Sequence, residues 1–179
     1  MKIKFYFFVN NYNGGPKIKI TNDGEKLYQA TLSEQGMKTV ELDADLKFPT
    51  ELAIQHYDKN MKYDTKVQED EIVDDKGFVL EKIEIDGYVL QNELYHFKFI
   101  KDNGEEIVNN NYVGYNGKYI INIDSASLPA WYFKLQKSFI NKLETFNYLQ
   151  FKDEILQGEK SEVIYWLLIG YFGQYLKNT

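Results

Sequence analysis

Apolar and polar residues alternate along the first nine residues, and this pattern limits the possible folds more than any other feature of the sequence. One side of the segment would carry Ile3, Phe5, Phe7 and Val9, and the other would carry Lys2, Lys4 and Tyr6. A period of two residues is typical of a β-strand with one face buried. The segment is therefore predicted to be a strand, and not a signal peptide, because lysines interrupt it and no small-residue cleavage site follows.

Further short strands are predicted at intervals up to residue 123, with turn sequences between them. Ile18 and Ile20 lead to the turn Asn22-Asp23-Gly24, after which residues 27–32 are expected to return antiparallel. Other expected strands cover residues 39–42, 52–54, 95–100, 107–113 and 119–123, and residues 78–85 would form two short strands or one bulged strand. Residues 1–125 are thus predicted to form a mainly β domain, an antiparallel two-sheet β-sandwich of jelly-roll-like type.

The period changes after residue 125, which predicts an α-helical C-terminal segment over residues 126–179. Ser127 can cap a helix that has Pro129 in its first turn, and further helices are expected at 148–156 and after Ser161. Residues 163–172 are apolar on all sides, so they must be buried within this chain or against another chain. Both interpretations stay open. For the second, the predicted interface residues are Trp131, Phe139, Ile164, Trp166, Leu167 and Phe172.

The composition argues against several classes of function. A net charge of −6, with no clustered Lys and Arg, disfavours nucleic-acid binding, and the apolar run 163–172 is about half the ~20 residues that cross a membrane. The chain has no Cys, which excludes disulfides and thiolate chemistry. Its two His lie within strand patterns, and neither a nucleophile elbow nor a phosphate-binding glycine motif is present. We therefore expect no enzyme.

An acidic, irregular segment is predicted between the strands that end near His56 and begin near Phe78. Carboxylates in a long loop suit calcium, which takes six to eight oxygen ligands, and the candidate ligands are Asp64, Asp74 and Asp75. The alternative is an ordinary acidic surface loop, since no spacing matches an EF-hand. The candidate residues for binding a ligand by stacking are Tyr57, Tyr63, Tyr88 and Tyr115, each of which could instead fill a sheet face.

The order of several short motifs resembles uncharacterised β-sandwich proteins of large tailed phages of marine bacteria. The sharpest are Asp64-Thr65, Asp75-Lys76 and Ile85-Asp-Gly87, within a resemblance that covers residues 1–125. These residues are also similar to calcium-dependent carbohydrate-binding modules, although this chain has Glu69-Asp-Glu71 where relatives have a Gly.

Two functions are expected from these patterns. The first, which the apolar helix favours, is a non-enzymatic phage virion structural or accessory protein. It would be located in the virion, or in the host cytoplasm during assembly, and would dock on virion or identical subunits through its C-terminus. The alternative is a calcium-dependent carbohydrate-binding module or host-surface adhesin, with glycans as partners.

Overall fold

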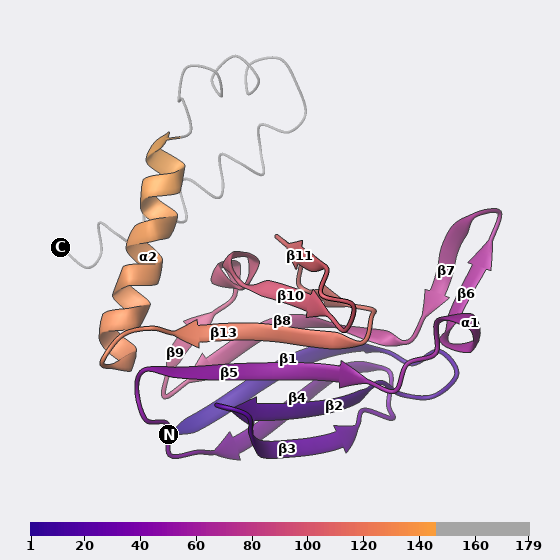
Figure 1. Cartoon of the computed structure of the whole chain (residues 1–179), viewed down its shortest axis with the longest axis horizontal. Helices are drawn as coiled ribbons and strands as arrows, with labels where there is room; N and C mark the ends of the chain where they lie inside the picture. Colours follow the sequence, from indigo (N-terminus) through magenta and orange to yellow (C-terminus); the bar gives the residue numbers. More distant parts are fainter. Residues whose placement is uncertain (146–179) are drawn as a thin grey trace. The chain divides into compact units, whose positions relative to one another are not determined.

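Two antiparallel sheets face each other in a computed structural model that describes the backbone of residues 1–145 and the side chains of residues 1–137 (Figure 1). The first sheet has the order β12 (Tyr112–Val113), β8 (Gly77–Ile85), β1 (Lys2–Asn10) and β4 (Gly36–Asp43), with β9 (Tyr88–Leu90) also paired to β8. The second has the order β11 (Glu106–Val108), β10 (Lys98–Lys101), β13 (Gly117–Ile123), β5 (Thr50–Tyr57), β2 (Lys17–Asn22) and β3 (Glu25–Thr31). The predicted mainly β, two-sheet sandwich is confirmed.

One apolar core fills the space between the sheets, and the alternating residues of the strands supply it. The inward side chains of β1 are the predicted Ile3, Phe5, Phe7 and Val9, all fully buried. Phe7 meets Phe78 of the neighbouring strand edge to face, with ring centroids 5.2 Å apart, a preferred aromatic geometry. Ile and Leu residues of β2, β5 and β13 face them from the second sheet. The same alternation leaves the opposite face of β1 available to solvent.

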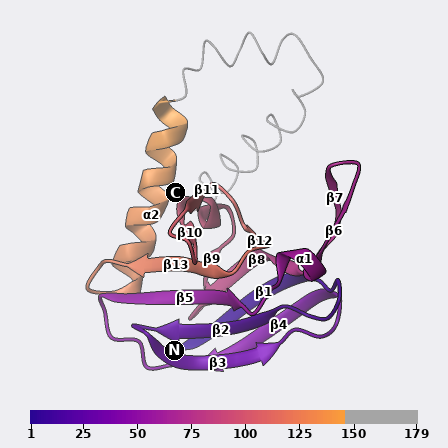
Figure 2. The same cartoon turned by 45° about the vertical axis from the view of Figure 1, so that its right-hand side comes forward.

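The acidic segment after β5 is not the irregular loop that the sequence predicts. It contains a one-turn helix, α1 (Met61–Asp64), and a hairpin of β6 (Thr65–Gln68) and β7 (Glu71–Asp75) that pair with each other. Figures 1 and 2 show this hairpin projecting from one end of the sandwich. The prediction failed because Glu69 and Asp70 form the hairpin turn, both with positive φ. Asn or Gly at these positions would have indicated a turn in the sequence.

A second correction concerns the predicted strand 95–100. Its first residues lie in a 3₁₀ helix, η1 (Asn92–His96), and only Lys98–Lys101 join the sheet as β10. The alternation of Tyr95, Phe97 and Phe99 was misleading because Tyr95 is exposed, whereas the other two are buried.

A helix, α2 (Leu128–Thr145), follows the last strand as predicted. Its first turn is capped by Ser127, whose Oγ accepts the backbone N–H of Ala130 at 3.4 Å. Trp131 is 3% exposed and stacks on Phe97, with ring centroids 6.1 Å apart. The chain divides into two compact units, residues 1–136 and 137–179, so the start of α2 packs as part of the sandwich unit. The predicted boundary at residue 125 stays a prediction, and the helices expected beyond residue 145 lie outside the described residues. Over residues 1–145, no helix is long and apolar enough to cross a membrane.

Candidate functional site

The outer face of the first sheet carries a β-bulge in β8, opposite Tyr6 of β1. Tyr6 pairs with Lys82 and Phe7 pairs with Leu80, so Glu81 is the extra residue. The bulge interrupts the alternation of side chains: Leu80 is buried, whereas Glu81 and Lys82 are both partly exposed. Of the two alternatives predicted for residues 78–85, the structure has the single bulged strand, and two polar side chains lie next to each other beside Tyr6.

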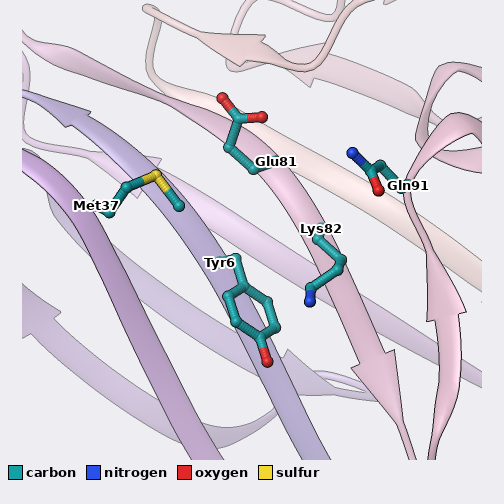
Figure 3. Close-up of a pocket in the computed structure, with 5 residues that line it drawn as sticks. All are labelled: Tyr6, Met37, Glu81, Lys82 and Gln91. Carbon is teal, nitrogen blue, oxygen red and sulfur yellow. The ribbon is translucent and has the colours of Figure 1, made fainter.

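A shallow groove of about 450 Å³ lies at this bulge, lined by Tyr6, Met37, Glu81, Lys82 and Gln91 (Figure 3). The close-up shows Met37 on one side of Tyr6 and Gln91 on the other side of β8. The Lys82 Nζ lies 3.9 Å from the centroid of the Tyr6 ring, which is a cation–π contact that holds the two side chains together. Carboxylate, ammonium and amide groups thus surround an aromatic ring.

The apolar surface continues from the groove along β1. Phe8 is 40% exposed, and Met37, directly opposite it on β4, is 59% exposed. Tyr6 and Phe8 are two residues apart on one strand, which places them about 7 Å apart along the same face. Large exposed side chains grouped on one face are a common mark of a binding surface.

Charged side chains of both signs lie on this face. Lys4 pairs with Glu41 at 3.3 Å, and the Tyr6 hydroxyl donates to Glu84 at 3.5 Å. The face carries no excess of cations that would attract an anion, and it suits a ligand that has apolar surface for the rings and hydroxyl groups for the polar side chains.

The aspartates predicted to bind calcium lie at one end of the sandwich, where two of them are paired with lysines. Asp75 is buried and accepts a hydrogen bond from the buried ammonium of Lys59. Asp64, also buried, pairs with Lys76 at 2.7 Å. Asp74 is exposed and accepts the backbone N–H of Asp75 at 3.0 Å.

Electrostatics at this end follow from these pairs. Burial raises the pKa of Asp64, but hydrogen bonds from Lys76, Asn60 and Asn13 outweigh it and hold that pKa below its ordinary value. Burial lowers the pKa of Lys59, and Asp75 partly offsets this effect. Within the described part of the chain, no group of three His, Cys, Asp or Glu side chains could hold a metal. Among the described residues at this end, Asp64 and Asp75 do not fit a calcium ion, because lysines already neutralise them.

The structure places three of the four tyrosines predicted to bind a ligand at one end of the sandwich and the fourth at the other end. Tyr57 accepts a hydrogen bond from Gln29 at 2.8 Å, and the highly exposed Tyr63 lies in α1 at the same end of the sandwich. Tyr115 is also at this end, with the Nζ of Lys101 over its ring at 4.1 Å.

The fourth tyrosine, Tyr88, begins β9 at the opposite end of the sandwich. Its ring packs against Tyr132 of α2, with centroids 5.0 Å apart. The four side chains therefore do not form one surface, and their roles in binding stay predictions.

The predicted interface residues are mostly beyond the described side chains. Trp131 is buried in the core of its own chain, so it is not available to a partner. Phe139 lies in the helical backbone of α2, but its side chain is outside the described residues, as are Ile164, Trp166, Leu167 and Phe172.

The groove residues were not among the sites predicted from the sequence. The available signal was the run Leu80-Glu-Lys-Ile83, in which two polar residues separate two apolar ones inside a strand pattern. That run indicates a bulge, and Tyr6 was already expected on the outer face of β1.

Comparisons with known proteins inform the fold. No family model matches the sequence, and no curated protein matches it. A structure of vCBM60 in complex with galactobiose superposes with a TM-score of 0.50 at 14% identity, covering 68% of this chain and 98% of that chain. A second match is the selenomethionine form of vCBM60, described with two families of calcium-dependent carbohydrate-binding modules that circular permutation links. It has a TM-score of 0.49 at 14% identity, covering 68% of this chain and 89% of that chain.

What is shared is the fold. The predicted similarity to carbohydrate-binding modules is confirmed at that level. Neither structure bears on the resemblance to phage proteins, which stays a prediction.

Proposed function

We propose that the chain is a non-catalytic carbohydrate-binding module that holds a saccharide in the groove over Tyr6. The observation that carries this proposal is the bulge at Glu81, which sets a carboxylate and an ammonium side by side next to a partly exposed aromatic ring. A sugar ring has hydroxyls around its edge and an apolar face of C–H groups, which would contact the part of the Tyr6 ring that Lys82 does not cover. Glu81, Lys82 and Gln91 offer acceptors and donors for those hydroxyls.

The saccharide is expected to be neutral. The charged side chains around Tyr6 are of both signs, and the chain as a whole carries a net charge of −6, which repels polyanions. Phe8 extends the apolar surface along β1, so a chain of at least two sugar rings would contact both aromatic side chains.

Binding, rather than hydrolysis, is the role that suits the groove. Glycoside hydrolysis generally uses two carboxyl groups that flank the scissile bond. Among the residues that line the groove, Glu81 alone has a carboxylate.

Affinity electrophoresis of the full chain tests this proposal. The probes are neutral polysaccharides, galactan among them, with an acidic polysaccharide for comparison. Tyr6→Ala should weaken binding by roughly 30-fold, equivalent to about 2 kcal/mol for the loss of a central aromatic contact. Phe133→Ala is the matched control, because Phe133 is an aromatic side chain that is 70% exposed and does not line the groove.

Retention of neutral polysaccharides that is lost in Tyr6→Ala and kept in Phe133→Ala would support the proposal. Circular dichroism must show that both variants are folded. Two results would overturn it: no retention of the unmodified chain by any neutral polysaccharide, or equal retention of Tyr6→Ala.

The role in a virion stays a separate prediction. It depends on docking through the C-terminal segment, where most of the predicted interface residues lie outside the described part of the chain. The predicted location in the virion depends on the same point.

A further inference from the structure

Four segments meet at the end of the sandwich where α1 lies, and two buried lysine–aspartate pairs hold them together. The segments are 10–13, 56–65, 75–76 and 112–116, which are far apart in the sequence. The pairs are Lys59 with Asp75 and Lys76 with Asp64.

The ammonium of Lys59 contacts two oxygen atoms of the kinds that bind a metal cation. The side chain is 0% exposed and donates to the carboxylate of Asp75 and to the carbonyl oxygen of Gly114. Carboxylate and backbone carbonyl oxygens are also the ligands that calcium takes. The backbone of Lys59 is fixed as well, because its N–H donates to Asn116 and its carbonyl accepts from the same amide, both at 2.8 Å.

The partner carboxylate joins two further segments to this ammonium. Asp75 accepts hydrogen bonds from the hydroxyl of Thr65 at 2.6 Å and from that of Tyr112 at 2.5 Å. One carboxylate therefore links the start of the β6–β7 hairpin, the end of that hairpin and strand β12.

The second pair has the same construction. Asp64 accepts from the ammonium of Lys76 at 2.7 Å, from the backbone N–H of Asn60 at 2.8 Å and from the side chain of Asn13 at 3.1 Å. The backbone N–H of Lys76 donates to the carbonyl of Asp64 at 2.8 Å. This pair ties the loop after β1 to α1 and to the end of the hairpin.

We propose that the ammonium groups of Lys59 and Lys76 take the place of a divalent cation in ordering this end of the sandwich. Each acidic side chain that the sequence offers for calcium, apart from the exposed Asp74, is neutralised by a cation that belongs to the chain itself. The folded state consequently requires no calcium, and chelation leaves it unchanged. This inference concerns the fold and does not depend on saccharide binding.

Thermal unfolding of the full chain in calcium and in EDTA tests the proposal, together with calorimetric titration by calcium chloride. The unmodified protein should have the same Tm in both conditions and give no heat of binding. Lys59→Met removes the ammonium and leaves a buried carboxylate without a cation, so its Tm should fall by roughly 10 °C. Lys98→Met is the matched control, because the pair of Lys98 with Glu106 is exposed, and its Tm should stay within about 1–2 °C of the unmodified protein.

The double variant Lys59→Met/Asp75→Asn removes the uncompensated charge and should recover part of the lost Tm, which keeps the test valid if the single variant does not fold. A rise in the Tm of the unmodified protein with calcium would overturn the proposal. So would a Lys59→Met protein that unfolds at the same temperature as the unmodified one.

Discussion

Acidification is expected to destabilise the fold through His56, a histidine of β5 that is completely buried. Its Nδ1 lies 3.1 Å from the carbonyl oxygen of Tyr115, to which an Nδ1–H donates, and its Nε2 has no hydrogen-bond partner among the described residues. The ring packs edge-on against Phe78, with centroids 5.7 Å apart. Burial, followed by the positive charge of Lys59, lowers the pKa of His56 to about 4.

The direction and size of the effect follow from this pKa. In the unfolded chain the imidazole has its ordinary pKa of 6.5, so between pH 6.5 and about 4 the unfolded chain binds a proton that the folded chain does not. The stabilisation is complete above pH 6.5 and is lost as the pH falls toward 4. The full difference corresponds to about 3 kcal/mol, of which about 2 kcal/mol is lost between pH 7 and pH 5.

Urea unfolding at pH 7 and pH 5, followed by far-ultraviolet circular dichroism, measures this loss. His56→Asn retains an N–H donor for the Tyr115 carbonyl but cannot titrate. Between pH 7 and pH 5, its free energy of unfolding should therefore fall by about 2 kcal/mol less than that of the unmodified protein. The carboxylates contribute equally to the pH dependence of both proteins, so their contribution cancels when the two are compared. Equal pH dependence in the unmodified protein and in His56→Asn would refute the argument.

Three further predictions concern packing, and urea unfolding checks each of them. Gly15→Ala should lower the free energy of unfolding by about 1–3 kcal/mol, because a Cβ there would overlap the backbone of Leu32; an unchanged value would show that the loop moves aside. Trp131→Ala should cost about 3–5 kcal/mol, and a cost under about 1 kcal/mol would mean that α2 does not pack on the sandwich core. Val67→Thr with Ile72→Thr should stay within about 0.5 kcal/mol, since both side chains are more than half exposed; a larger loss would place them in a packed environment.

The sandwich could be predicted from the sequence because its strands have one buried face. In β1 the alternation of Phe5 and Phe7 with Lys4 and Tyr6 assigns each side chain to a face, and the structure keeps that assignment. The β6–β7 hairpin has no buried face, so Val67 and Ile72 produced no recognisable period. A strand without a buried face need not alternate apolar and polar residues, so its sequence carries no pattern from which it can be predicted.

The pairing of the acidic residues could not be predicted from the sequence. Asp75 and Lys59 are 16 residues apart, and Asp64 and Lys76 are separated by the whole β6–β7 hairpin. In the sequence the aspartates stand out as a group of carboxylates, whereas each lysine looks like one of many solvated charges. Only the meeting of four segments at one end of the sandwich decides that a lysine, and not an ion, neutralises each of these carboxylates.

The bulge in β8 connects the fold to the proposed site more directly than any single side chain does. A regular strand would direct Glu81 and Lys82 to opposite faces, and one of the two charges would then point into the apolar core, at a high cost in free energy. Inserting one residue keeps Leu80 and Ile83 in the core and directs both charges outward. The insertion occurs where β8 runs beside Tyr6, so the same irregularity that protects the core also surrounds the aromatic ring with hydrogen-bonding groups. The aspartates at the acidic end are instead neutralised by lysines, and for that reason we regard the groove, rather than the acidic end of the sandwich, as the place to look for a ligand.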